Sequence, residues 1–267
     1  MEDDGDRTQV PWLSDMVENE LQALFSEDRD EIARAVLHFL RASTHDPEIE
    51  EHLIELLELA MEHGNDDGTA SVWAVVILGE MGTSRPIPFL QRALMAEGDE
   101  VLQDAARVAL LRIGSSAIES LLTTIDEEGY AAFNRNAYSV LAMVGFIHDD
   151  VLSRRVIDFL QERLEIERRT EKSESALEEL IQAIARLGDR TQIEPIREIL
   201  QSNFGGSNPA IQDSLEFLQE NTDGVPIVTD LTPWEERYGW IFEKSEPRAR
   251  LTRDEEGRIS MEYGAEE

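Results

Sequence analysis

The stretch TASVWAVVILGEMGTSRPIPFLQRALMA, residues 69–96, decides the fold of this 267-residue chain. Its first half is an apolar run that reaches Gly82, where a glycine is expected to end a helix because it adopts a positive φ without strain. After a short polar break, Ile87, Leu90 and Leu94 recur at helical spacing. The stretch therefore predicts two helices joined by a glycine turn.

Versions of this unit recur down the chain. Apolar helical segments end at Gly82, Gly114, Gly145 and Gly188, at spacings of 32, 31 and 43 residues, and the long third interval predicts an insertion at 161–174. A period of roughly 30 to 45 residues built from two helices is typical of an α-solenoid, because neither helix buries its apolar face alone. Small residues recur eight positions before three of the glycines and predict close helix approach: Ala74, Ala106 and Ala137.

The repeat resembles a known family. An alanine-rich helix ending in L-G-x-x-G, followed by I-P-x-L-x-x-x-L, is similar to HEAT-like repeats, in particular the short kind of bacterial repeat proteins and phycobilin lyases. The resemblance covers roughly residues 69–202 and is fullest at Ala74, Leu78, Gly79, Gly82, Ile87, Pro88, Leu90 and Leu94. It implies an all-α fold, an α-solenoid of antiparallel helix pairs, with about five pairs over residues 11–224.

The two ends of the chain differ from the repeats. Residues 1–10 predict a disordered acidic leader, and residues 225–267 predict a short C-terminal extension outside the repeats. This extension is either a cap folded onto the final helices or an exposed motif that docks in trans and gives a weak dimer. The last residues predict either a hairpin that pairs 248–252 with 259–263 or disorder. Four aromatic residues of the extension are the candidates for docking: Trp234, Tyr238, Trp240 and Phe242.

The charge of the chain is strongly acidic, with 57 acidic and 24 basic residues and a net charge of −33. Phosphate backbones would be repelled, so nucleic-acid binding is not expected. The acidity indicates either basic partners or adaptation of the protein to salt or genome composition. Between Arg41 and Arg85 there is no lysine or arginine, and the acidic residues there predict either a solvated outer face or a docking surface.

The N-terminus, MEDDGDRTQV, lacks the basic start and apolar segment of a signal peptide. The longest apolar run, Val72–Leu78, is too short to span a bilayer. We therefore expect a cytoplasmic protein without membrane contact.

Residues for catalysis are not evident in the sequence. The chain has no cysteine, no G-x-S-x-G motif and no phosphate-binding G-x-x-x-x-G-K-[ST] loop. Deoxyhypusine hydroxylase resembles the expected architecture, but its family binds two irons through His-Glu dipeptides, and none occurs among the five histidines here. We therefore predict no enzymatic activity and no catalytic, metal-binding or cofactor-binding residues.

The sequence favours a scaffold that binds a protein or peptide, basic in character, on a concave face lined by the second helix of each repeat. Trp73 has a second interpretation as a packing residue, since it lies within a continuous apolar run. The alternative function is an accessory lyase- or chaperone-like factor for a cofactor-carrying protein, which needs an apolar pocket with convergent polar groups. The candidate partner-binding residues are Trp73, Glu80, Asp104, Arg107, Asn136 and Tyr138.

Overall fold

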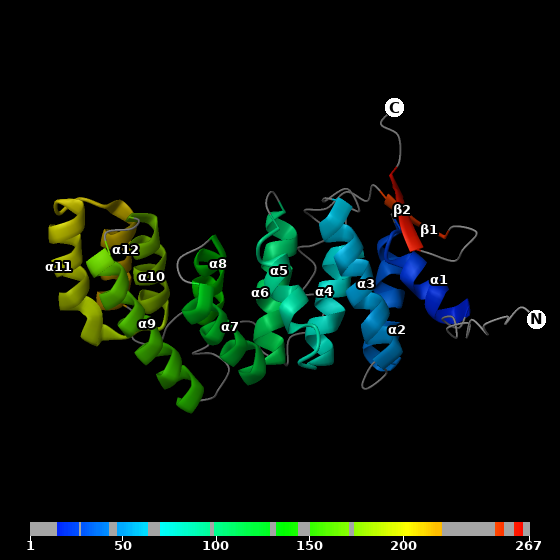
Figure 1. Cartoon of the computed structure of the whole chain (residues 1–267), viewed down its shortest axis with the longest axis horizontal. Helices are drawn as coiled ribbons and strands as arrows, with labels where there is room; N and C mark the ends of the chain where they lie inside the picture. The colour runs from blue at the N-terminus through cyan, green and yellow to red at the C-terminus, as the bar shows by residue number, and fades with distance from the viewer. Residues whose placement is uncertain are drawn as a thin grey trace, which may run out of the picture.

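The protein is described by a computed structural model, over residues 15–26, 28–42, 47–63, 70–96, 99–128, 132–143, 150–170, 174–220, 249–253 and 259–263. Up to residue 220 the regular elements of these ranges are helices, which confirms the all-α fold class. The helices follow one another in chain order along the longest axis of the molecule, from α1 at one end to α11 and α12 at the other (Figure 1). Their bounds are α1 Asp15–Ala23, α2 Arg29–Ala42, α3 Pro47–His63, α4 Ala70–Met81, α5 Ile87–Ala93, α6 Glu100–Ile113, α7 Ser115–Glu128, α8 Ala132–Leu141, α9 Asp150–Thr170, α10 Glu174–Arg186, the 3₁₀ turn η3 Arg190–Gln192, α11 Ile193–Phe204 and α12 Pro209–Glu220.

The helices form two rows. In the even row each helix packs against the next, in the order α2, α4, α6, α8, α10 and α12. In the odd row α3 packs against α5, α5 against α7, and α7 against α9. Each odd helix from α3 to α11 also packs against the even helix that follows it in the chain. Contacts between helices therefore run mainly between neighbouring pairs.

Helix ends follow the local signals in the sequence. Gly82, Gly114 and Gly188 have φ angles of 69°, 82° and 75°, which side chains with a Cβ rarely adopt. These three glycines confirm the predicted helix ends, whereas Gly145 lies outside the described residues. At the start of α2, the carboxylate of Asp28 accepts a hydrogen bond of 2.9 Å from the backbone N–H of Asp30, which caps the helix.

Helix α4 differs from its neighbours because it is buried on all sides. Ten successive residues, 70–79, are buried, so this helix has no solvated face. A Cβ added at Gly79 would lie 2.5 Å from the Cα of Ala109 in α6. The absence of a side chain at Gly79 therefore sets how closely α4 and α6 approach. Ala74, Ala106 and Ala137, the residues predicted to allow close approach, are all buried.

The two irregular parts of the sequence take different forms. Most of the predicted insertion at 161–174 lengthens α9, which runs for 21 residues. Beyond the helices, β1 (Ala249–Arg253) pairs antiparallel with β2 (Ile259–Tyr263), as the hairpin interpretation predicts with a shift of one residue in the first strand. This pair lies toward the α1 end of the long axis (Figure 1). The acidic leader 1–10 and the aromatic candidates at 234–242 lie outside the described residues.

Candidate partner-binding surface

Two of the six candidate residues lie in the core. Trp73 of α4 and Tyr138 of α8 are both 0% exposed. Neither side chain is at a surface that a partner contacts, so their assignment as partner-binding residues is corrected. Trp73 instead fits its second interpretation as a packing residue, because a large aromatic side chain stabilises a core through the area that it buries.

Two further candidates hold helices together. Arg112 at the end of α6 donates a 2.9 Å hydrogen bond to the carboxylate of Glu80 at the end of α4. The side-chain amide of Asn136 donates to the backbone carbonyl of Leu94, which ties α8 to the end of α5. Both interactions join helices from different pairs, so Glu80 and Asn136 have structural roles.

The remaining two candidates are the more exposed ones. Asp104 and Arg107 form a 2.5 Å ion pair one turn apart on α6, and their side chains are 36% and 25% exposed. Water reaches both partners, so the pair is expected to contribute little to stability. These two side chains remain candidates for contact with a partner.

The exposed face of the even row becomes clear when its helices are aligned on their terminal glycines. Positions ten, six and two residues before the glycine fall on one side of each helix, since they are four residues apart. We call the residues at these positions in α6, in α8 with the turn that follows it, and in α10 the even-row strip. Its described members are partly exposed, or exposed in the case of Arg186: Asp104, Val108, Arg112, Ser139, Met143, Glu178, Gln182 and Arg186.

Of the strip residues, only Asp104 is among the six candidates predicted from the sequence, because those candidates were chosen by residue type. A tryptophan in an apolar run attracts attention, whereas Gln182 and Arg186 are ordinary surface residues in isolation. The signal that identifies the strip is its fixed offset from each terminal glycine. That offset predicts a face only after the even helices are known to form one row.

The acidic residues of α3 are partly neutralised by the next pair. Glu51 lies 3.4 Å from Arg85, and Glu58 lies 3.1 Å from Arg92 of α5. Glu50 is buried and accepts a hydrogen bond from the hydroxyl of Thr83. The stretch without lysine or arginine therefore meets basic and hydroxyl groups that come from about one repeat later in the chain.

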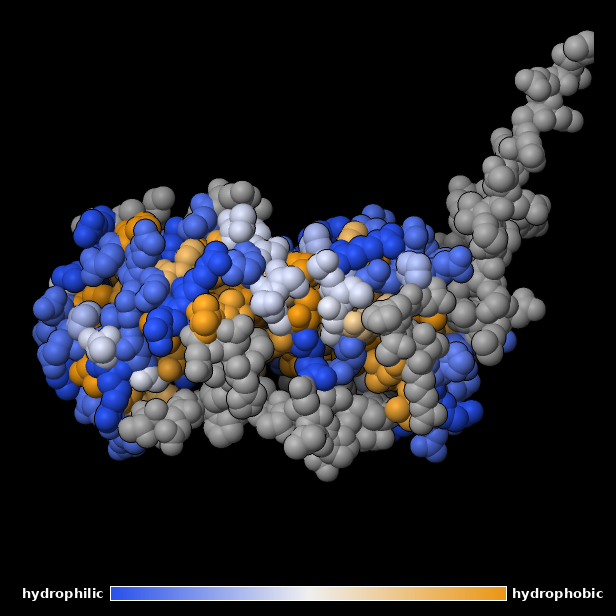
Figure 2. All heavy atoms as spheres, turned by 90° about the horizontal axis from the view of Figure 1, so that it is seen from below, coloured by the Kyte–Doolittle hydropathy of each residue, from blue (hydrophilic) through white to orange (hydrophobic). Residues whose placement is uncertain are grey.

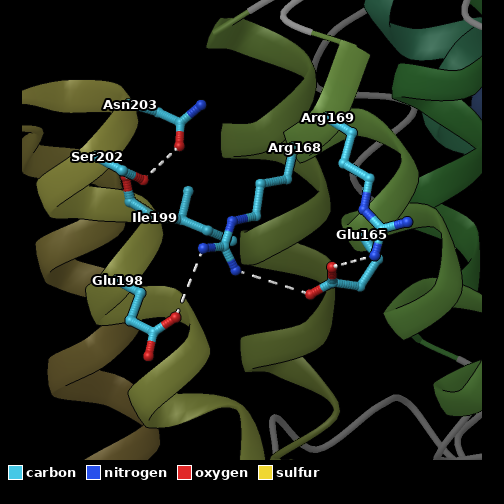
Figure 3. A network of polar contacts seen from close by, with 7 residues as sticks. All are labelled: Glu165, Arg168, Arg169, Glu198, Ile199, Ser202 and Asn203. Atoms are coloured by element: carbon cyan, nitrogen blue, oxygen red, sulfur yellow. Dashed lines mark hydrogen bonds and ion pairs between the residues drawn. The ribbon is translucent and has the colours of Figure 1, made fainter.

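Charged and polar residues are spread along the molecule. On the face shown in Figure 2, hydrophilic residues extend from one end to the other and hydrophobic residues lie among them in small groups. Toward the far end of the odd row, Arg168 of α9 lies 3.8 Å from Glu165 and 3.5 Å from Glu198 of α11 (Figure 3). Side chains of both signs thus join neighbouring helices across the surface.

The described residues were also compared with the requirements of a metal site and of a membrane span. Among them, no three His, Asp or Glu side chains come together in a way that could hold a metal ion. In the same part of the chain, no single helix has the length and apolar composition to cross a membrane. The segments 100–113 and 115–126 meet that test only as a pair, and they are bent by 118°.

The fold and this surface define the class of the protein, an all-helical protein with its helices in two rows. No family model matches the sequence, and no curated protein is significantly similar to it. The resemblance to HEAT-like repeats therefore rests on the residues of the repeat itself.

Proposed function

We propose that the two rows form an α-solenoid of HEAT-like helix pairs that acts as a non-enzymatic scaffold. Polar contacts about one period apart support this architecture. Arg92 bonds Glu58 across 34 positions, Arg112 bonds Glu80 across 32, and Gln91 donates to Ser120 across 29. Such contacts are expected where each repeat is stabilised mainly by its neighbours.

The observation that carries the functional proposal is the even-row strip. Its side chains are partly or fully exposed, and they continue through three neighbouring helices of the even row that the rest of the fold holds in place. Mixed polar side chains on a rigid row of helices suit recognition of an extended protein segment, as other solenoids recognise their partners. The partner class is therefore a protein or peptide that lies along α6, α8 and α10.

The charge of the chain favours a basic partner. A net charge of −33 attracts cationic segments before they touch the surface, which raises the rate at which such a partner meets the protein. Within the strip, the partly exposed carboxylates of Asp104 and Glu178 can meet the basic groups of a partner, while the exposed Arg186 opposes a segment of uniform positive charge and Arg112 is already paired with Glu80. We infer that the partner carries net positive charge with acidic residues at intervals.

Site-specific photo-cross-linking in cells of the source organism tests the proposal. A photoreactive amino acid is placed at position 104 or 182 in the strip, and a matched control carries it at 162, where the exposed Glu162 lies on α9 of the odd row. We expect the two strip positions to give the same cross-linked protein and position 162 not to give it. Identical products at all three positions, or none at the strip positions, would contradict the proposal.

A further inference from the structure

The even-row strip has an uncharged middle line. Val108, Ser139 and Gln182 stand at the same position of α6, α8 and α10, six residues before the terminal glycine, and each is partly exposed. Arg112 and Glu80 are both two residues before their glycines, and they form a 2.9 Å hydrogen bond between α6 and α4. Aligned positions of neighbouring even helices thus lie side by side, and the middle line crosses the three helices at one level.

The acidic groups beside the middle line differ between α6 and α10. On α6, Asp104 pairs with Arg107 at 2.5 Å. On α10, Glu178 accepts a hydrogen bond from the neutral side chain of Asn208 and has no basic partner in the described part of the chain. The carboxylate that a basic group of a partner can neutralise therefore lies at the α10 end of the strip.

Apolar side chains lie beside the middle line on α6 and α8. Val108 and Met143 pack against the core and are still partly exposed. The three aligned positions of α8 are Arg135, Ser139 and Met143 in the sequence, so none of them offers a carboxylate. These two helices therefore favour apolar side chains of a partner over basic ones.

Gln182 provides a group that can bind the backbone of a partner. Its side chain is partly exposed, and among the described residues its carboxamide makes no hydrogen bond. A carboxamide both donates and accepts hydrogen bonds. An α-helical partner uses its backbone groups internally, whereas a polyproline II segment leaves its N–H and C=O groups unbonded. The carboxamide of Gln182 therefore favours an extended partner.

The spacing of the helices selects the form of the extended segment. The axes of packed helices lie about 8–10 Å apart. In polyproline II, with three residues per turn and a rise of about 3.1 Å per residue, side chains on one side repeat about every 9.3 Å. On one side of a β-strand they repeat about every 6.8 Å, which is shorter than the helix spacing. Every third residue of a polyproline II segment can therefore contact the next even helix.

We propose that the even-row strip binds a seven-residue polyproline II segment through every third side chain. Apolar side chains at one end and in the middle contact α6 and α8, and a basic side chain at the other end lies beside Glu178 of α10. The exposed Arg186 keeps this basic side chain at the Glu178 end of α10. Because it takes the strip as the partner-binding surface, this assignment rests on the proposed function, and it specifies the partner segment.

Fluorescein-labelled peptides and the full chain test the proposal, with binding measured by fluorescence polarisation at low salt. The probe is L-P-P-L-P-P-R, used in this order and in reverse, because proline favours polyproline II. L-P-L-P-R and L-P-P-P-L-P-P-P-R carry the same three side chains at spacings of two and four residues. We expect the probe to bind at least about fivefold more tightly in one of its two orders, since the other spacings leave one apolar side chain in water.

A second pair of changes locates the basic side chain. We expect Glu178→Gln to weaken binding of L-P-P-L-P-P-R about three- to fivefold and to leave binding of L-P-P-L-P-P-Q unchanged, because only the first peptide loses a partly exposed ion pair. Glu162→Gln on α9 of the odd row is the matched control and should affect neither peptide. An equal effect of Glu178→Gln on both peptides would overturn the placement of the basic side chain.

Three other results would overturn the polyproline II segment. These are equal affinity at all three spacings, no binding at protein concentrations up to about 1 mM, and tighter binding of a helical peptide with the same side chains seven residues apart, about 10.5 Å along its axis. The cross-linking test separates this failure from failure of the proposed function. A protein cross-linked at both 104 and 182, with no peptide bound, would keep the scaffold and remove the segment. Peptides bound with the expected spacing and no protein cross-linked would keep the segment and remove the scaffold.

Discussion

At Gly79, helix α4 passes close enough to α6 that a single methyl group has no room. The added Cβ would lie 2.5 Å from the Cα of Ala109, and backbone atoms cannot move aside as a flexible side chain can. We expect Gly79→Ala to lower the free energy of unfolding by about 1–3 kcal/mol through overpacking, although alanine is the better helix former by about 1 kcal/mol. Urea denaturation followed by circular dichroism measures the change.

Two further variants separate overpacking from backbone effects at Gly79. Ala109→Gly removes the opposing methyl group at 2.6 Å but leaves the Cα at 2.5 Å, so the double variant is expected to recover only part of the overpacking cost. Gly82→Ala meets no atom within 4 Å and tests only the strain of its positive φ, expected to cost about 1 kcal/mol. A Gly79→Ala protein more stable than the parent would contradict the close approach.

The buried ion pair of α9 makes a second prediction at the scale of a residue. Arg163 lies 3.2 Å from Glu167 one turn later and 3.8 Å from Asp126 of α7, and both Arg163 and Glu167 are buried. Arg163→Met removes the cation and leaves a buried carboxylate, which is expected to cost about 3 kcal/mol. Changing Glu167→Leu as well should recover most of that loss, since two apolar residues need no pairing. Thermal unfolding of the single and double variants checks this, and an equal loss in both would contradict the prediction, because removal of the buried carboxylate would then recover nothing.

Between elements, the ion pairs of the odd row are expected to be weak. Arg168 joins α9 to Glu198 of α11 at 3.5 Å, with side chains 32% and 67% exposed (Figure 3). Exposed pairs typically contribute about 0–1 kcal/mol because water screens them and long side chains lose freedom. We expect Arg168→Gln to lower the free energy of unfolding by less than about 1 kcal/mol, and by nothing measurable in 1 M NaCl. A loss as large as that of Arg163→Met would show that the link between α9 and α11 is stronger than its exposure indicates.

The elements also show which parts of the structure are predictable from sequence. Helix ends at Gly82, Gly114 and Gly188 are predictable because the requirement for a positive φ is local to one residue. The burial of Trp73 is indicated by the continuous apolar run in which it lies, because α4 has no solvated face between residues 70 and 79. Glu50 is the opposite case, since it belongs to the acidic stretch and yet is buried against Thr83, 33 positions away. Local sequence thus predicts the repeats and their turns, whereas the side of each helix that is buried depends on long-range packing.

For the whole molecule, the acidity itself leads to a prediction. A net charge of −33 on 267 residues produces repulsion between repeats that the ion pairs on the surface offset only in part. Repulsion between charges extends about 30 Å at 0.01 M salt and about 3 Å at 1 M. We therefore expect NaCl to stabilise the folded protein over this range and to raise Tm by roughly 5 °C, corresponding to about 1–3 kcal/mol.

The form of the salt response distinguishes charge screening from a general solvent effect. Screening depends on ionic strength, so NaCl and KCl at equal concentration should raise Tm by the same amount, with most of the rise at low salt where the range of repulsion shortens fastest. Sucrose at matched osmolality acts by exclusion from the protein surface and controls for that contribution. If NaCl lowers Tm, the ion pairs between repeats outweigh the repulsion between acidic residues. The acidic residues would then favour a surface that binds basic partners, and not a surface whose repulsion salt relieves.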